Sequence, residues 1–594
     1  MARGFSRVTE GAFHQGHSLR KAPSVSRKRL PPPRKRGGLR RFANFTPRLS
    51  YKPAPHYRRA MTTRDSSPHR AVTANIRIAT PVNIRTHPAN VETRRGRKAR
   101  INFLNIRALT AALLATATPA IAGPVLAPPA APGPAVQRVV AIPAGRIALT
   151  HVKVIDGTGG PAQADRTVLI DGLRIAAVQS ASAPVPAGYT VRDMTGHTVL
   201  PGLVGMHDHL YYIARPDLDG EGHSEPPLLV PQMTFSAPRL YLAAGVTTLR
   251  TTGSVEPYAD LNTKRQIDAG VLPGPHLDVT APYLEGAGSP FIQMHQLTGP
   301  ADARAQVAYW AGQGATSFKA YMNITRAELA AAIDEAHKRG LKLTGHLCSV
   351  TYPEAAALGI DNLEHGFSVN TQLDPGKRPD LCPDSAGTPT LDAMRPGTPD
   401  ADALIALLVR RHVAVTSTLP VREPYSPHWR GLGPAALAVM SPQARIDYYA
   451  QRDRATRQPP ERRARNAQRW ANMLAMERAF VAAGGLLLAG PDPTGAGNVL
   501  PGFGDVREVE LLVEAGFTPV EAIRIATLNG ATYLGLADRI GTVAAGKAAD
   551  LLVVEGDPAT RIDDLERPAI VFKDGVGYDP ARLLASVSAR YGQY

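Results

Sequence analysis

Segments typical of buried strands and of amphipathic helices alternate along residues 203–536, and this alternation restricts the fold more than any other feature. Short apolar runs mark expected strands at 245–250, 315–321, 342–348, 360–365, 412–419 and 486–490. Capping boxes at Thr325–Glu328 and Thr518–Glu521 indicate where two of the helices begin. Repeated strand–helix units predict an α/β fold with a parallel sheet, and their number favours an eight-stranded (β/α)8 barrel of the TIM type. An open doubly wound sheet is the alternative, but the Gly-rich phosphate turn that it needs after its first strand is missing from the sequence.

Shorter strands are expected on both sides of this region. Residues 147–154 and 167–178 alternate apolar and polar side chains, and Asp171-Gly172 provides a turn pair. A similar pattern returns at 540–554 and 569–572. We therefore expect a small β-sandwich domain formed by both ends of the mature chain, from residues 146–202 and 537–576, followed by a C-terminal tail at 577–594.

The strong positive charge of the chain belongs to its N-terminal leader. The formal net charge is +18, but residues 1–122 contain 26 Lys/Arg and 3 Asp/Glu, whereas residues 123–594 contain 42 and 47. Residues 1–100 also lack hydrophobic periodicity, so we expect them to be a basic disordered leader. An RNA-binding tail is the alternative. For the remainder, which has a net charge of −5, we expect no nucleic-acid partner.

A signal peptide is predicted at residues 101–122. Basic residues at 94–107 precede the small apolar stretch 108–122, which ends in Ala120-Ile121-Ala122. This order is typical of a secretory signal peptide. The stretch is shorter than the roughly 20 apolar residues of a stable membrane span. We expect cleavage near Ala122 and export to the periplasm or medium, with the Pro/Ala/Gly-rich residues 123–145 as a linker.

Cys348 and Cys382 are the only cysteines in the sequence. In an oxidising compartment they could form a disulfide that closes a loop of 33 intervening residues. Such a bond would contribute about 3 to 4 kcal/mol. Two separate buried thiols are the alternative, and in either case the fold depends on a hydrophobic core.

Side chains suited to metal binding follow the ends of the expected strands. His207 and His209 are two residues apart at a strand end, so both rings can point to one face and bind one cation. Lys319, His346 and His365 lie towards the carboxyl ends of strands four, five and six, and Asp492 follows strand eight. In a barrel the carboxyl ends of the strands meet at one rim, where all six residues are expected. Taken singly, His346 could be a core histidine, Lys319 a snorkelling lysine and Asp492 a helix cap.

These motifs resemble the amidohydrolase superfamily, and within it the imidazolonepropionase-like and prolidase-like metal-dependent hydrolases. The resemblance spans about residues 147–575. It includes Pro201-Gly202-Leu203 before His207-x-His209, Gly245-Val246-Thr247-Thr248, Glu364-His365-Gly366, and the tail Ile540-Gly541-Thr542 with Gly546-Lys547-x-Ala549-Asp550-Leu551.

The resemblance implies a site with two divalent metal ions. His207 and His209 would hold one ion and His346 and His365 the other, with a CO2-derived carbamate on Lys319 between them. Two cations lower the pKa of a bridging water, and Asp492 would bind metal, take the water's proton and pass a proton to the leaving amine. Zinc suits an imidazole-rich site, and manganese or cobalt could replace it.

The sequence thus predicts a binuclear metal-dependent hydrolase that cleaves an amide-type C–N bond in a dipeptide, an N-acyl amino acid or a related small molecule. A lactonase or phosphotriesterase using the same site is one alternative, and a catalytically inactive binding protein is another. A mononuclear deaminase would not need Lys319. A homo-oligomer is compatible with the sequence.

Two departures from the family pattern bear on the substrate. Thr251 follows Arg250 where many relatives carry Asp, and Leu347-Cys348 follow His346 where prolidase-like members often place a substrate-contacting tyrosine. Prolidase specificity is therefore not expected. Candidate substrate contacts in place of that tyrosine are Tyr321, Tyr211 and Tyr212, with buried packing as the alternative role.

Two long segments after strands six and seven, residues 367–399 and 421–469, could form a lid over the rim. The second segment has 10 Lys/Arg against 4 Asp/Glu, which suits an anionic substrate. A solvated helical face is the alternative.

Overall fold

Short parallel strands occupy the centre of the region between residues 203 and 489. The computed structural model describes residues 132–214, 228–289, 291–494 and 498–593. One parallel sheet contains β7 (Leu203–Gly205), β8 (Val246–Arg250) and β9 (His276–Asp278). The other contains β10 (Ser317–Ala320), β11 (Lys342–Gly345), β12 (Asn362–Leu363), β13 (Ala414–Ser417) and β14 (Leu487–Ala489). In both sheets each strand pairs with its neighbour in sequence, which confirms the predicted α/β fold with parallel sheets.

Backbone hydrogen bonds join these two sheets at both edges. Beyond β9, the Ala281 N–H donates to the carbonyl of Ser317 in β10 at 2.9 Å. At the other edge, the Met206 N–H directly after β7 donates to the carbonyl of Ala489 in β14 at 2.9 Å. The carboxyl ends of β7 and β14 therefore lie next to each other although they are far apart in the sequence.

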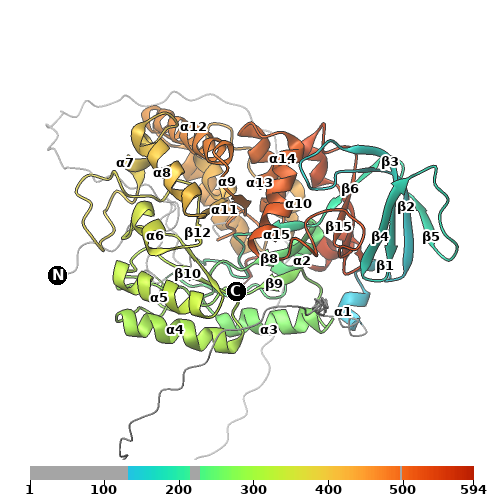
Figure 1. Cartoon of the computed structure of the whole chain (residues 1–594), viewed down its shortest axis with the longest axis horizontal. Helices are drawn as coiled ribbons and strands as arrows, with labels where there is room; N and C mark the ends of the chain where they lie inside the picture. The colour runs from blue at the N-terminus through green and yellow to red at the C-terminus, as the bar shows by residue number, and fades with distance from the viewer. Residues whose placement is uncertain (1–131, 215–227, 290, 495–497, 594) are drawn as a thin grey trace, which may run out of the picture. The chain divides into compact units, whose positions relative to one another are not determined.

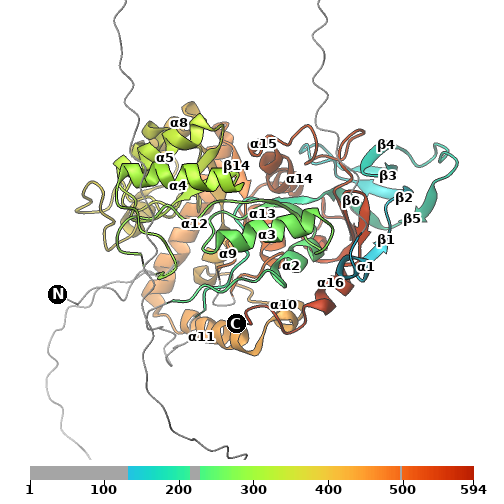
Figure 2. The same ribbon diagram turned by 90° about the horizontal axis from the view of Figure 1, so that it is seen from below.

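Helices follow most of these strands, and their starts match local sequence signals. Thr325 and Glu328 form the predicted capping box of α5, and Thr518 and Glu521 form that of α14. Figures 1 and 2 both show α4 and α5 packed side by side. The helices of this region are α2 (Ala237–Ala243), α3 (Pro257–Asp268), α4 (Pro300–Gln313), α5 (Arg326–Lys338), α6 (Tyr352–Leu358), α8 (Pro399–Arg410), α12 (Pro460–Ala482), α13 (Phe503–Glu514) and α14 (Pro519–Arg524).

Strands from both ends of the described chain form one nine-stranded sheet, which lies beside the parallel strands in Figures 1 and 2. Its strands are β1 (Val140–Ile142), β2 (Arg146–Val154), β3 (Gln163–Asp171), β4 (Arg174–Ser180), β5 (Thr190–Asp193), β6 (His197–Pro201), β15 (Leu551–Glu555), β16 (Pro568–Lys573) and β17 (Val576–Tyr578). The two ends meet where β6 pairs antiparallel with β15, with Val199 opposite Val553. Both valines are fully buried in a separate apolar core that includes Leu149 and Phe572. This core explains why the ends of the chain alternate apolar and polar residues.

Three boundaries differ from those predicted. The expected linker 123–145 already contains β1, because Val140 and Ile142 pair with β17 inside the sheet. The expected tail 577–594 contains the end of β17 and the helix α16 (Pro580–Ser586), whose Leu583 is fully buried. Residues 540–549 form a loop rather than strands, and hydrogen bonds such as that from the Val543 N–H to the Asp156 carbonyl hold it. The predicted leader 1–100 and signal peptide 101–122 lie outside the described residues.

The remaining helices are short connections, apart from α11, or lie near the chain ends. They are α1 (Pro134–Gln137), α7 (Thr388–Ala393), α9 (Leu419–Arg422), η1 (Glu423–Tyr425), α10 (Pro434–Val439), α11 (Pro442–Thr456), η2 (Ile525–Asn529), α15 (Gly530–Tyr533) and η3 (Ile562–Glu566). Within the described ranges, no helix is long and apolar enough to cross a membrane.

Candidate metal centre

Six side chains meet where the parallel strands end, and we call them the rim cluster. His207 and His209 follow β7, Lys319 lies in β10, His346 follows β11, His365 follows β12, and Asp492 follows β14. Each of the six is at most 5% exposed. The structure therefore brings together all six residues that the strand spacing selects, in a place shielded from bulk water.

The Asp492 carboxylate lies among three of the histidines. Its Oδ1 is 3.2 Å from His209 Nε2 and 3.4 Å from His207 Nε2. Its Oδ2 is 3.7 Å from His365 Nδ1. The His207 Nε2 atom also lies 3.2 Å from Lys319 Nζ. The His346 ring adjoins that of His365, with centroids 4.4 Å apart.

Two members of the cluster have left-handed backbone conformations. The φ angles are 65° at His365 and 56° at Asp492, a region that only a few per cent of non-glycine residues adopt and in which Asn, Asp and His are the most common. Backbone hydrogen bonds hold both conformations. The Asp492 N–H donates to the His207 carbonyl, and the N–H of Gly366, directly after His365, donates to the Thr416 carbonyl. Such strain is common where a side chain must be aimed at a functional site.

Burial favours the neutral form of three of the imidazoles, which is the form that binds a metal ion. It lowers the pKa of His209 to about 4 and the pKa values of His346 and His365 well below the usual range. Burial also disfavours the ionised form of Asp492, but His207, His209 and His365 outweigh it and hold the pKa of this carboxyl well below its usual range. The cluster thus combines neutral nitrogen ligands with a carboxylate.

Several buried atoms of the cluster lack the partners that buried polar groups normally have. Within the described part of the chain, His346 Nδ1, His365 Nε2 and Asp492 Oδ1 make no hydrogen bond. His207, His365 and Asp492 each offer a ligand atom within 4.8 Å of the other two. Imidazole and carboxylate groups at this spacing fit a divalent transition-metal ion.

Glu364 supports His207 from behind, a role that the sequence analysis did not assign to it. Its Oε2 is 2.7 Å from His207 Nδ1, and its Oε1 accepts hydrogen bonds from Arg250 at 2.9 Å and Asn362 at 3.0 Å. Burial alone would raise the pKa of Glu364, but Arg250 and His207 hold it at about 2. The Glu directly before His365 in the motif Glu364-His365-Gly366 was the available sequence signal.

Other supports come from distant segments that no local pattern could reveal. The Tyr241 hydroxyl accepts a hydrogen bond from the His209 N–H at 3.1 Å and donates to the His209 carbonyl at 3.0 Å. His365 Nδ1 lies 2.9 Å from Thr418 Oγ1. These contacts fix the backbone of His209 and the ring of His365.

Two of the three candidate tyrosines lie beside the rim cluster. Tyr211 stacks on His209 with centroids 4.4 Å apart, and its hydroxyl is 2.6 Å from that of Tyr283. Tyr321 lies edge-on to His346 at 5.0 Å. Tyr212 instead donates to Asp447 at 2.5 Å and packs against Tyr591 in the main apolar core. Tyr212 therefore packs in the main apolar core.

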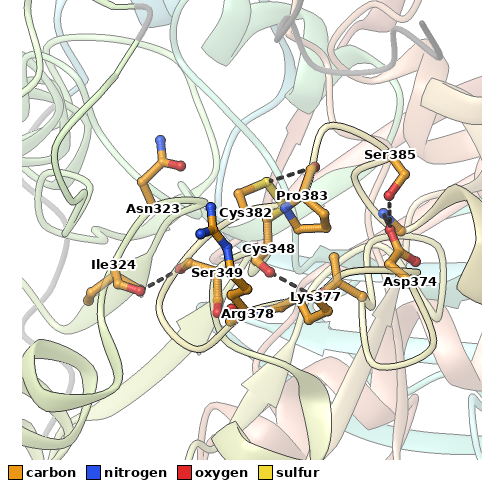
Figure 3. Close-up of a disulfide and its surroundings, with 12 residues drawn as sticks. Asn323, Ile324, Cys348, Ser349, Asp374, Lys377, Arg378, Cys382, Pro383 and Ser385 are labelled. Carbon is orange, nitrogen blue, oxygen red and sulfur yellow. Dashed lines mark hydrogen bonds between the residues drawn. A yellow bond between two sulfur atoms is a disulfide. The ribbon is translucent and has the colours of Figure 1, made fainter. Parts of the chain in front are cut away.

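Cys348 and Cys382 form a disulfide (Figure 3). Cys348 is two residues after His346, a member of the rim cluster. The Cα atoms are 4.9 Å apart. Nearby, the Ser349 hydroxyl donates to the Ile324 carbonyl at 2.5 Å, and Lys377 Nζ donates to the Ser349 carbonyl at 2.6 Å. These bonds tether the first of the two long segments to the end of β11.

Some arginines of the basic segment 421–469 form ion pairs with aspartates. Arg469 contacts Asp392 at 2.6 Å, and Arg457 contacts Asp453 at 2.9 Å. The charge of Arg422 also acts on the rim cluster, because after burial and Lys319 it helps to lower the pKa of His346. The segment thus reaches the surroundings of the rim cluster through Arg422.

Comparisons with known proteins point to one family. The Amidohydrolase family model matches residues 463–576, a stretch that contains Asp492, and the other five rim residues precede it. In sequence, an adenine deaminase of Ligilactobacillus salivarius (strain UCC118) is 39% identical over 69 residues, which cover 12% of this chain and 12% of that enzyme. The chain thus aligns with only a small part of this curated relative's length.

Solved structures match over a much longer range. A protein of Bifidobacterium longum assigned as a prolidase is 26% identical, with a TM-score of 0.53 over 73% of this chain and 94% of that chain. A Xaa-Pro dipeptidase with bound methionine in its active site is 21% identical, with a TM-score of 0.53 over 73% of this chain and all of its own.

Proposed function

Because the resemblance to the amidohydrolase superfamily and to its prolidase-like members is confirmed, we propose that this chain is a metal-dependent hydrolase that cleaves an amide-type C–N bond with two divalent ions. One observation carries this proposal: four histidines, a lysine and an aspartate from five separate strands converge in one buried cluster. Unpaired buried nitrogen atoms in that cluster support metal binding.

We propose that His207 and His209 would hold one ion and that His346 and His365 would hold the second, with Lys319, as a carbamate, as a further ligand. The contact of 3.2 Å between Lys319 Nζ and His207 Nε2 supports a lysine that takes part in the site rather than one that reaches for solvent. Zinc is the metal we propose, with manganese or cobalt as substitutes. When bound, the ions supply an activated water and polarise the substrate carbonyl.

Asp492 is the proposed proton carrier. Its low pKa keeps it ionised, so it can accept a proton from the attacking water and later deliver one to the leaving amine. Glu364 would orient His207, and Tyr241 would hold the backbone of His209. Tyr211 and Tyr321 flank the histidines and are the proposed substrate contacts.

The proposed substrates are dipeptides, N-acyl amino acids and related amides. The likeness to structures assigned as a prolidase and a Xaa-Pro dipeptidase supports the amide class. A lactonase or phosphotriesterase activity of the same site is the alternative. The excess of basic residues in the segment 421–469, with 10 Lys/Arg against 4 Asp/Glu, favours an anionic substrate within the amide class.

We also propose that the two parallel sheets are parts of one closed (β/α)8 barrel spanning residues 203–536, with the nine-stranded sheet as a β-sandwich domain. The backbone bonds at both sheet edges support closure. Export after cleavage near Ala122 is a further proposal. The Cys348–Cys382 disulfide supports it, because disulfides persist mainly in oxidising compartments.

Hydrolysis of a panel of dipeptides, N-acyl amino acids, lactones and phosphotriesters by the purified protein tests the proposal. We expect amide cleavage that falls by about 10²- to 10⁴-fold in Asp492→Asn, which keeps the shape of the side chain but cannot accept the proton. Tyr212→Phe, which alters a tyrosine of the core, serves as the control and should keep most of the activity. Cleavage of esters alone, or substantial turnover by Asp492→Asn, would contradict the proposal.

A further inference from the structure

A second group of metal-ligand side chains lies away from the rim cluster, and we call it the junction cluster. It consists of His276, Asp550 and Asp574. His276 begins β9 at the amino end of a parallel strand, Asp550 directly precedes β15, and Asp574 lies in the turn between β16 and β17. The cluster therefore joins the three-stranded parallel sheet to the nine-stranded sheet.

Local structure fixes the position of the Asp574 carboxylate. Asp574 and Gly575 form a two-residue connection between paired strands, with φ angles of 50° and 71°. An Asp-Gly pair favours such a turn because both residues tolerate positive φ. The Asp574 N–H donates to Asp550 Oδ1 at 2.7 Å, which brings the two carboxylates together.

The second oxygen of Asp550 lacks a partner. Asp550 is 4% exposed, and its Oδ2 accepts no hydrogen bond from any described residue. This atom lies 3.8 Å from His276 Nε2, which is too far for a hydrogen bond. His276 Nε2 is closer to Asp574 Oδ2, at 3.1 Å. Since one ring nitrogen carries at most one proton, an imidazolium could satisfy Asp574 but would leave Asp550 Oδ2 unpaired.

The charges around the cluster leave an excess of negative charge. Lys573 Nζ lies 3.2 Å from Asp574 Oδ2 and offsets one of the two carboxylates. With a neutral imidazole, one negative charge remains next to the buried oxygen of Asp550. Leaving a buried carboxylate oxygen without a partner is costly, so the geometry calls for a cation between the three groups.

We propose that His276, Asp550 and Asp574 bind a zinc ion that ties the two sheets together. An ion about 2.0 to 2.2 Å from each ligand holds tetrahedral ligand atoms about 3.3 Å apart, close to the separations of 3.1 and 3.8 Å. One imidazole with two carboxylate oxygens is a ligand set that zinc accepts. The His276 side chain is 32% exposed, which gives the ion a route to the site and water a place to complete the coordination.

This site is independent of the proposed hydrolase function, because it shares no residue with the rim cluster. The experiment uses the purified full chain, dialysed against zinc and then against zinc-free buffer, with bound zinc measured by mass spectrometry. We expect His276→Gln and Asp574→Asn each to retain one zinc ion per chain fewer than the wild type. The Asn variant preserves the turn, since Asn also tolerates positive φ.

His295→Gln is the matched control, because His295 also contacts a carboxylate, that of Asp302, at 2.9 Å, but belongs to no group of three ligand side chains among the described residues. It should retain as much zinc as the wild type. A zinc-edge anomalous map of wild-type crystals should show a peak between the three side chains. Equal zinc content in the wild type and both junction variants, or an anomalous map without that peak, would overturn the proposal.

Discussion

Glu364 Oε2 lies 2.7 Å from His207 Nδ1 in a region where both side chains are fully buried. The contact leaves His207 Nε2 facing Lys319 and Asp492, so one nitrogen is used for support and the other for the site. Histidines that bind metal commonly have such a carboxylate behind them, which fixes the tautomer and the ring orientation.

We therefore expect Glu364→Gln to weaken metal binding at the rim cluster by about 10- to 100-fold. The substitution removes the charge that holds the His207 proton and leaves Arg250 with a weaker partner. Metal affinity can be measured by titration of the metal-free protein. The control is Asp302→Asn, which alters an exposed contact with His295 and should leave the affinity unchanged. Unchanged affinity in Glu364→Gln would show that His207 needs no carboxylate support.

The disulfide should stabilise the fold by about 3 to 4 kcal/mol, because it closes a long loop in the unfolded chain. We expect Cys348→Ala/Cys382→Ala to lower the free energy of unfolding by about that amount, measured with a chemical denaturant. The wild type under reducing conditions provides the matched comparison and should approach the double variant. Equal stability of all three samples would mean that the bond contributes nothing to the fold.

The stability of the protein should depend on the ionisation of Glu285. Burial raises the pKa of this group to about 8, although Asn323 donates hydrogen bonds to it at 2.7 and 3.2 Å. The folded pKa therefore exceeds the value of 4.5 for an exposed Glu. The contribution of protonated Glu285 to the free energy of unfolding is therefore complete below pH 4.5 and is lost as the pH rises towards about 8.

Glu285→Gln keeps the shape but cannot ionise, so its stability should not show this decline. Relative to the wild type, the variant should gain up to about 1.4 kcal/mol per pH unit between about pH 5 and pH 8. Denaturant unfolding at both ends of this range measures the difference. Parallel pH profiles for the two proteins would mean that Glu285 ionises in the folded state as it does in water.

Local signals in the sequence predicted much of the fold. Thr325 and Thr518 marked helix starts because a capping box involves residues only three positions apart. The α/β class followed from the alternation of apolar runs. By contrast, β9 spans only His276–Asp278, too short for periodicity to show, and β1 was hidden by the Pro/Ala/Gly-rich composition around it.

The candidate site could be predicted only where the residues follow strands in order. Lys319, His346 and His365 are 27 and 19 residues apart, each about one strand–helix repeat, so their spacing was informative. Tyr241 and Thr418 support the site through contacts with segments 32 and 53 residues away, which depend on the helix and strand that carry them. The disulfide likewise required the fold to bring Cys382 next to Cys348.

The metal content of Lys319→Ala tests the central claim most directly. The variant and its parent should both carry His276→Gln, so that only ions at the rim cluster are counted. We predict about two ions per chain in the parent, with loss of at least one ion and of nearly all amide hydrolysis in the Lys319→Ala variant. A parent that is fully active with a single ion, or a Lys319→Ala variant that keeps both ions and full activity, would contradict the account.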